Sequence, residues 1–304
     1  RYHLHQPDEL LAWLAADHPD WVKTKPATTS GSDIAVLLGV SSAEIEREAD
    51  RRESFEIKAE FKLDGSLLIR SGFDEQDRGP DTVHLHTRNQ RNGSSQAVLP
   101  GTSVAGALRQ RAQRIAHTLA VADKKTREER QKARDGVQDF IDQMFGPAEI
   151  RSGKQARASR VTVNEEFIEG GRSLVQTRIK IDRFTQGTME TALLEEAPHF
   201  GGSVKLHLKL NIIPNQNTDA EIGLLLLVLK DLWLGDLPLG GASSVGRGRL
   251  QGQSATLRWQ PGKRELNLSA AGALEPRDEQ ASAKLESYVQ ALPQALAPKT
   301  EDEK

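Results

Sequence analysis

The chain has 304 residues, no cysteine and a formal net charge of −2, from 41 Lys and Arg against 43 Asp and Glu. The absence of cysteine excludes a disulfide scaffold, a Cys-ligated zinc site and a Cys nucleophile, and it fits the cytoplasmic location that we expect. The near-neutral charge argues against a protein that coats nucleic acid with its whole surface, and no stretch approaches the roughly 20 apolar residues of a membrane span.

Residues 1–52 are predicted to form an N-terminal extension outside the core domain. An apolar stripe predicts a helix over 6–22, a Pro-, Ser- and Gly-rich linker follows over 23–33, and a second helix is predicted over 41–53. The chain starts at Arg1 without an initiator methionine. We therefore expect a processed or divided piece of a longer protein, with this extension as the end of an upstream module or a tether to a neighbour.

The core domain is predicted to begin with a strand over 55–63, where apolar and charged residues alternate. Asp64-Gly65 is a turn signal, so residues 66–70 are predicted to return as the second strand of a hairpin. A short strand over 82–87 carries His84 and His86 on one face. That face is expected to be solvated, although either histidine could act as a base or contact phosphate.

A helix is predicted from about Val104 to His117, with Ser103 as its N-cap. The N-terminus of such a helix can bind an anion, and ordinary capping is the alternative. The basic stretch 124–135 fits a solvated helix face at least as well as a binding surface. Further along, the pattern predicts helices over 137–145 and 220–235, strands over 161–163, 174–181, 203–213 and 248–259, and a run of helix formers over 189–196.

The glycine-rich run 240–250 combines bare backbone with two guanidinium groups, those of Arg247 and Arg249. Such a run can cradle phosphate through backbone N–H groups, and a plain turn between a helix and a strand is the alternative. It is not a nucleotide-binding P-loop, because Arg247 and Gly248 stand where that motif needs Lys and then Ser or Thr.

The order of these elements predicts an α+β fold in which helices back a sheet. We divide the chain into the extension 1–52, a core domain over 53–270, and a C-terminal region over 271–304 that holds a helix and a flexible tail.

Four segments resemble motifs of the RAMP superfamily of CRISPR systems, in the family's order. Residues 99–109 resemble its "IPGSSLKGALR" motif, and 145–146 with 158–163 resemble "FG … GRLRVSDA", although Asn164-Glu165 replaces Asp-Ala. Residues 179–188 are similar to "VRIDRxTG", and 240–250 are similar to "GGxxSRGxGRV". The group that the chain resembles most is the backbone subunit of type III effector complexes, which bind guide RNA and cut paired target RNA.

The resemblance implies a ferredoxin-like, RRM-type sheet with helical insertions and a β-hairpin "thumb". The thumb would start near Arg183, include residues 185–194, and wedge between nucleotides of the guide–target duplex. The implied partners are guide RNA, complementary target RNA and other subunits of a type III complex. The RNA-binding residues implied in this way or expected from the anion sites are Pro100, Gly101, Thr102, Ser103, Arg109, Arg160, Arg183, Thr185, Met189, Gly240, Gly241, Ser243, Ser244, Arg247 and Arg249.

Catalysis in the family depends on an Asp in the loop before the "PGSS" motif. Asp81 is our choice, with Asp77 and Asp74 as alternatives, because Asp81 follows Gly79-Pro80 and precedes a short hydrophobic run. The resemblance implies that a ribose 2′-OH attacks the adjacent phosphate with the help of a divalent cation, expected to be Mg²⁺ and held by Asp81. A turn-forming or capping role for the Asp is the structural alternative.

Three other functions stay open at this point. The chain could be a non-catalytic scaffold that only holds RNA. It could be a stand-alone ribonuclease that processes guide precursors without metal, with His84 or His86 as the base. It could also be a protein-interaction module with no RNA.

Overall fold

The computed structural model describes Ser41 and residues 52–71, 79–89, 93–148, 156–213, 217–262, 264–269, 275–276 and 279–297. The chain separates into two units, residues 1–51 and 52–304, and the second unit holds the core domain. The helices expected over 6–22 and 41–53, with the linker between them, fall outside the described residues except for Ser41, Arg52 and Glu53.

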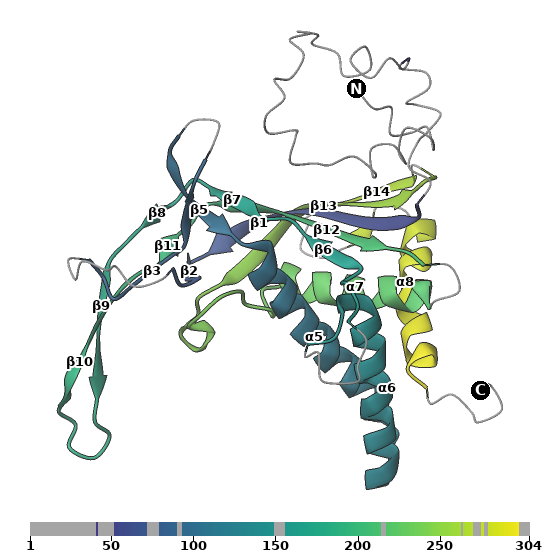
Figure 1. Ribbon diagram of the computed structural model, residues 1–304, viewed down its shortest axis with the longest axis horizontal. Coiled ribbons are helices and arrows are strands. Elements are labelled where there is room, and N and C mark those ends of the chain that lie inside the picture. Colours follow the sequence, from purple (N-terminus) through teal and green to yellow (C-terminus); the bar gives the residue numbers. More distant parts are fainter. Residues whose placement is uncertain are drawn as a thin grey trace, which may run out of the picture. The chain divides into compact units, whose positions relative to one another are not determined.

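A nine-stranded sheet organises the core domain (Figure 1). Its strands run in the order β15-β14-β13-β1-β12-β7-β5-β4, and β6 also pairs with β12. These strands are β1 (Ser54–Asp64), β4 (His86–Arg88), β5 (Ser95–Leu99), β6 (Val161–Val163), β7 (Glu166–Glu169), β12 (Ser203–Asn211), β13 (Arg249–Gln260), β14 (Arg264–Ser269) and β15 (Glu275–Pro276).

Helices cover one face of this sheet, as Figure 1 shows. They are α5 (Gly101–Val121), α6 (Arg127–Phe145), α7 (Thr218–Trp233) and α8 (Glu279–Ala295). The apolar helix α7 is buried along most of its length and contacts α5, α8 and β13. Alternate apolar side chains of β1 and β12 face these helices, so the period-two pattern of both strands places the core on one side of the sheet.

Two three-stranded sheets lie beside the large one and support a long hairpin. One has the order β3-β10-β9 and the other β2-β11-β8. Their strands are β2 (Ser66–Leu67), β3 (Thr82–Val83), β8 (Arg172–Ser173), β9 (Gln176–Ile181), β10 (Thr188–Ala197) and β11 (His199–Phe200). Strands β9 and β10 form the hairpin that extends away from the rest of the domain in Figure 1.

Several sequence predictions are confirmed and others are corrected. The strands expected at 55–63, 161–163, 203–213 and 248–259 are present, and so are the helices expected at 104–117, 137–145 and 220–235. The hairpin predicted at Asp64-Gly65 is wrong, because β2 pairs with β11 while both edges of β1 are taken by β12 and β13. The helix formers of 189–196 lie in strand β10, in keeping with the implied thumb.

The single strand expected over 82–87 is also corrected. It divides into β3 and β4, which belong to different sheets. His84, between them, is fully buried, so its predicted solvent exposure is wrong. The fold class predicted from the sequence, an α+β protein with helical and hairpin insertions, is confirmed. No helix in the described part of the chain is long and apolar enough to cross a membrane.

Candidate nucleic-acid interface

The tip of the β9–β10 hairpin is a hydrogen-bonded turn that presents Phe184. The Asp182 carboxylate accepts hydrogen bonds from the backbone N–H groups of Phe184, at 2.7 Å, and Thr185, at 3.0 Å. The Thr185 and Phe184 N–H groups lower the pKa of Asp182, so its carboxylate stays ionised and holds the turn. The Asp182 N–H donates to Gly187 and the Gln186 N–H donates to Asp182. The Phe184 ring is 98% exposed on this ordered turn.

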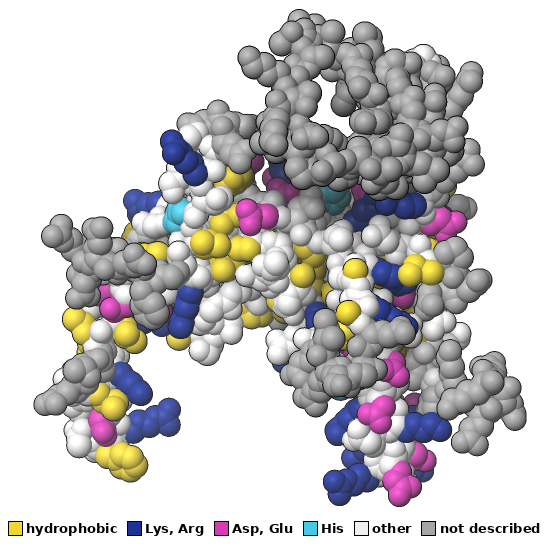
Figure 2. All heavy atoms as spheres, in the orientation of Figure 1, with side chains coloured by type: hydrophobic (Ala, Val, Ile, Leu, Met, Phe, Trp, Pro, Cys, Tyr) yellow, Lys and Arg dark blue, Asp and Glu magenta, His cyan; other side chains and the backbone are white. Residues whose placement is uncertain are grey.

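Other apolar side chains are exposed along the same hairpin. Figure 2 shows hydrophobic and basic side chains together on it, with a hydrophobic side chain at its tip. Exposed apolar side chains in this number make the hairpin a candidate binding surface. Its exposed large members are Val175, Ile179, Ile181, Phe184, Met189, Leu193 and Leu194.

Arg247 of the glycine-rich run anchors the base of this hairpin. Its side chain is 3% exposed, and Nη1 lies 2.9 Å from the Glu196 carboxylate in β10. Its Nη2 donates to the Gln176 side chain in β9 at 2.8 Å. Arg178 lies 3.2 Å from the same Glu196 oxygen. Arg247 thus ties the glycine-rich run to both strands of the hairpin, and its guanidinium is occupied by protein partners.

Asp81 lies at the same base. It precedes β3, whose Thr82 and Val83 pair in parallel with Glu196 and Ala197 of β10. The exposed Asp81 side chain accepts a 2.7 Å hydrogen bond through Oδ2 from the Glu195 N–H. The alternatives Asp74 and Asp77 fall outside the described residues. In the part that is described, no group of three or more His, Asp or Glu side chains is placed to hold a metal ion.

The glycine-rich run is a turn fastened to the segment after β1. The Gly241 N–H donates to Leu68 and the Gly248 N–H donates to Ser66, both at 2.7 Å. Gly248 has φ +80°, and a Cβ there would lie 1.9 Å from the Leu239 carbonyl oxygen, so only glycine fits. The exposed residues of the run are Gly240, the short 3₁₀ turn Ser243–Val245 with the following Gly246, and Arg249. Of the residues predicted to contact phosphate here, Ser243, Ser244 and the exposed Arg249 remain candidates. Gly240 and Gly241 form the turn that precedes them.

The N-terminus of α5 differs from the prediction in detail. The helix begins at Gly101, three residues earlier than expected, so Ser103 lies within the first turn and Pro100 occupies the N-cap position without a side-chain cap. Thr102 and Ser103 are exposed. A Cβ on Gly101 would lie 2.2 Å from the Val163 carbonyl oxygen, which explains the glycine by close packing against β6. The N–H groups of this first turn face solvent and suit an anion.

Two arginines expected to contact RNA have partners inside the protein. Arg109 of α5 donates to Asp142 of α6 at 2.6 Å and to the Gly146 carbonyl oxygen. Arg160 forms an ion pair with Glu221 of α7 and donates to the Gln143 carbonyl at 3.3 Å. The Glu221 side chain is 1% exposed. Both arginines join the helices to one another, so we leave them out of the RNA contacts proposed below. Arg183 and Thr185, in contrast, are exposed at the hairpin tip.

Three histidines cluster beneath the base of the hairpin, with ring centroids 5.8–6.4 Å apart: His84, His86 and His199. His84 accepts a hydrogen bond at Nδ1 from the Ile69 N–H, so its neutral ring carries the proton on Nε2. Burial, together with smaller effects of the neighbouring His199 and His86, lowers the pKa of His84 to about 4. Burial also lowers the pKa of His199. His86 is exposed, so of the two histidines considered as a base it alone is accessible.

This cluster predicts a loss of stability in mild acid. His84 takes up a proton near pH 6.5 in the unfolded chain but only near pH 4 in the folded chain. The stability that neutral His84 contributes to the folded state is therefore fully present above pH 6.5 and is lost as the pH falls towards 4. The loss from His84 is about 3 kcal/mol at most. The variant His84→Asn keeps a hydrogen-bond acceptor for the Ile69 N–H but does not titrate. In urea unfolding between pH 7 and pH 4, its free energy of unfolding should therefore decline less steeply than that of the wild type. An equal decline in both proteins would contradict the assignment.

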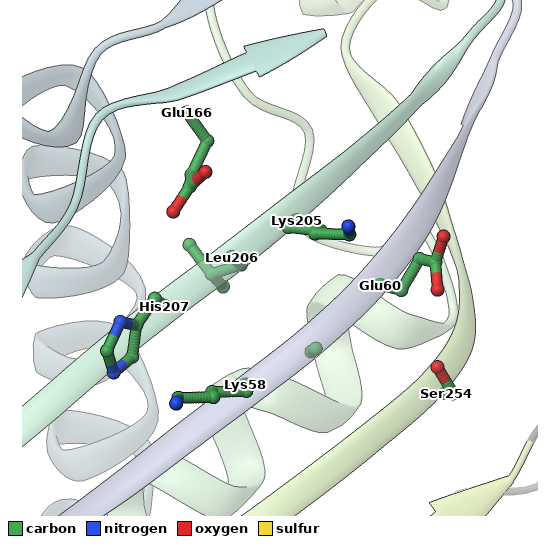
Figure 3. A pocket seen from close by; sticks show the side chains of 8 residues that line it. Lys58, Glu60, Glu166, Lys205, Leu206, His207 and Ser254 are labelled. Carbon is green, nitrogen blue, oxygen red and sulfur yellow. The ribbon is translucent and has the colours of Figure 1, made fainter. Parts of the chain in front are cut away.

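The face of the large sheet opposite the helices has a mixed charge. A pocket of about 280 Å³ lies on it, and Figure 3 shows Lys58 and Glu60 of β1, Lys205 and His207 of β12, and Glu166 of β7 around it. Glu56 on this face lies 3.6 Å from both the His207 ring and the Lys209 amine. Because carboxylates alternate with the lysines, this face is a weaker candidate for binding a phosphate backbone than a uniformly basic surface would be.

The RNA-binding residues predicted from the sequence include Met189 but not Phe184. Met189 is 41% exposed on β10, whereas Phe184 is 98% exposed at the tip. A usable signal was present, because Phe184 follows two residues after Asp182, a residue type whose side chain caps turns in this way. No sequence pattern indicated the ion-pair partners of Arg109, Arg160 and Arg247, because these partners lie far away in the sequence.

The comparison with protein families agrees with this architecture. The sequence profile of the RAMP superfamily matches residues 60–251, which include the end of β1, the first turn of α5, the hairpin and the glycine-rich run. No curated protein matches the chain. Since the profile covers more than half of the 304 residues, the chain belongs to the RAMP superfamily.

Proposed function

We propose that this protein is a guide-RNA-binding backbone subunit of a type III CRISPR effector complex, which acts in the cytoplasm and cleaves target RNA paired with the guide. Family membership supports an RNA-binding role in CRISPR systems and association with partner Cas subunits. The type III assignment and the cleavage rest on the motif resemblance and on the arrangement around the hairpin.

The observation that carries the proposal is the exposed apolar hairpin with Phe184 at its tip. A fully exposed aromatic ring on an ordered turn is poorly placed in water and well placed to stack on a base. Basic Arg183 lies beside it for the phosphates. The first turn of α5 and the Ser243–Val245 turn supply N–H groups for further phosphates of the guide.

Cleavage is assigned to Asp81, at the base of the hairpin. The reaction is attack of a ribose 2′-OH on the adjacent phosphate, which forms an O–P bond and releases the 5′-oxygen of the next nucleotide. The Asp81 Oδ1 atom has no partner among the described residues, while Oδ2 accepts a hydrogen bond from the Glu195 N–H. This oxygen would either hold Mg²⁺, which binds through one or two carboxylate oxygens and substrate phosphates, or accept the 2′-OH proton. When bound, the ion would neutralise charge on the attacked phosphate.

A non-catalytic scaffold is the second candidate, and one contact favours it. The Asp81–Glu195 hydrogen bond fixes β10 next to β3, which is a structural reason for an acid at this position. A metal-independent ribonuclease has weaker support, because His84 is buried with a pKa of about 4 and only His86 is open to substrate.

RNA that copurifies with the chain tests the proposal as a whole. We expect the protein, purified from cells that express a CRISPR array and the partner subunits, to carry RNA of uniform guide length. Recovery of the assembled complex without RNA would contradict the proposal and favour a protein-interaction module.

The stacking role of the tip gives a separate prediction. Phe184→Ser should weaken binding of labelled target RNA by the guide-loaded complex about 5- to 150-fold, since loss of one base–aromatic stack costs about 1–3 kcal/mol. The dissociation constant from filter binding measures this effect. Leu234→Ser is the matched control, because Leu234 is also exposed and apolar but lies at the end of α7. Equal affinities of the two variants would exclude Phe184 as a wedge.

A further inference from the structure

A groove between α5 and α6 lies on the helical layer and has no role in the proposed function. Its volume is about 420 Å³, and its polar lining consists of Gln110, Gln113, Arg114, His117, Thr118 and Arg134. No carboxylate lines it in the described part of the chain. The two helices run side by side in Figure 1, so the groove receives side chains from both walls.

The two guanidinium groups of the groove differ from other arginines on the same helix. Arg109 is paired with Asp142 and Arg111 with Asp231, each at 2.6 Å. Arg114 and Arg134 have no ion-pair partner among the described residues, although acids are frequent on α6. The neighbouring Glu129 is engaged in the capping box of α6 with Thr126. Arg114 of α5 and Arg134 of α6 thus line the same groove without an acidic partner among the described residues.

His117 adds a third group that lacks a partner. It is partly buried at the groove, and its Nε2 atom is buried without a hydrogen-bond partner within the described residues. Burial, and then the charge of Arg134, lowers the pKa of His117. An anion bound beside Arg134 and His117 would counter this positive charge.

We propose that the α5–α6 groove is a phosphate-binding site, in which Arg114 and Arg134 hold one phosphate group between them. Guanidinium groups bind phosphate oxygens in a bidentate way, and the Gln110 amide can donate a further hydrogen bond. The volume admits a phosphate with an attached sugar. The ligand is a phosphate of an RNA backbone or a free phosphate ester, which share this chemistry.

Inorganic phosphate is the first probe, used with the full chain. The Tm of the wild type should rise with phosphate concentration at constant ionic strength set with chloride, because a ligand of the folded state stabilises it. Arg114→Gln/Arg134→Gln should lose this rise. Arg127→Gln/Lys132→Gln, which removes two charges from α6 outside the groove, should keep it. The same phosphate-dependent rise in the wild type and in the Arg114/Arg134 variant overturns the proposal.

A second arm identifies the source of the phosphate. The dissociation constant of a short single-stranded RNA is measured over a range of salt concentrations. If the groove holds an RNA phosphate, the slope of log K against log[salt] should decrease in magnitude by about 0.7 in the Arg114/Arg134 variant. If the Arg114/Arg134 variant loses the phosphate-dependent rise in Tm but keeps the salt slope of the wild type, the ligand is a free phosphate ester. Because the first arm uses no RNA, it decides on the groove even if the guide-binding function is wrong.

Discussion

Replacement of Arg160 by alanine is expected to lower the free energy of unfolding by about 3–5 kcal/mol, the usual cost of leaving a buried charge unpaired. Arg160 pairs with Glu221, which is 1% exposed on α7, and it also bonds the Gln143 carbonyl at the end of α6. Burial raises the pKa of Glu221, and the Arg160 charge opposes that rise. Without Arg160, the carboxylate would have to stay charged in the core or take up a proton. Urea unfolding at pH 7 measures the loss.

Two companion variants separate this charge effect from lost packing. Glu221→Gln in the Arg160→Ala background removes the unpaired charge and should recover part of the loss. The double variant Arg160→Met/Glu221→Leu replaces the ion pair by apolar side chains of similar volume. Its free energy of unfolding should be close to that of the wild type. The deficit of Arg160→Ala should also shrink as the pH falls towards 4.5, because burial raises the pKa of Glu221 and this side chain then becomes protonated in the folded state of both proteins. A deficit that is independent of pH and of Glu221 would show that the pair is not its origin.

Asp81→Asn is expected to slow target cleavage about 10²- to 10⁴-fold while guide and target binding are retained, which is the usual effect of losing a general base. The amide keeps an oxygen that can accept the Glu195 N–H but removes the negative charge. Asp81→Ala removes both, so its additional effects report the structural role of the contact. Single-turnover rates measure the effect of each variant on cleavage, and the dissociation constant of target RNA measures its effect on binding. If Asp81→Asn cleaves normally and Asp81→Ala is impaired, the residue has only a structural role.

Local patterns were sufficient for strands β1, β6, β12 and β13 of the large sheet and for its helices, but strands β5, β7, β14 and β15 were not predicted. The alternation in β1 and β12 follows from one buried face, and the apolar run of α7 follows from burial on nearly all sides. Strand partners were not predictable in this way. Asp64-Gly65 does reverse the chain, but β1 pairs with β12 and β13, which lie more than 130 residues further along the chain. A turn dipeptide carries no information on such distant partners.

Strand β10 shows how tertiary pairing overrides local preference. Its helix formers favour a helix in isolation, yet β9 and β3 supply backbone hydrogen-bond partners on both edges. The resemblance to the RAMP superfamily gave the correct hairpin here, although its turn falls at 182–187 and its first strand begins at Gln176, before the predicted start.

The arginines show the limit of motif reasoning for the candidate site. Arg109, Arg160 and Arg247 stand in motifs that suggest phosphate contacts, but their partners Asp142, Glu221 and Glu196 come from distant segments. A basic residue in a binding motif can therefore hold the site in shape instead of contacting the ligand. The contacts proposed here fall on residues that the structure exposes, namely Phe184, Arg183, Ser243 and Ser244.

Cleavage of a labelled RNA by the reconstituted, guide-loaded complex tests the central claim most directly. The assay compares RNA that is complementary to the guide with RNA that is not, with Mg²⁺ and with EDTA, for the wild type and Asp81→Asn. We predict that only complementary RNA is cut, that EDTA abolishes the cuts, and that Asp81→Asn binds the RNA without cutting it. Undiminished cleavage by Asp81→Asn, or cleavage that persists in EDTA, would contradict the assignment of a metal-dependent nuclease to this site.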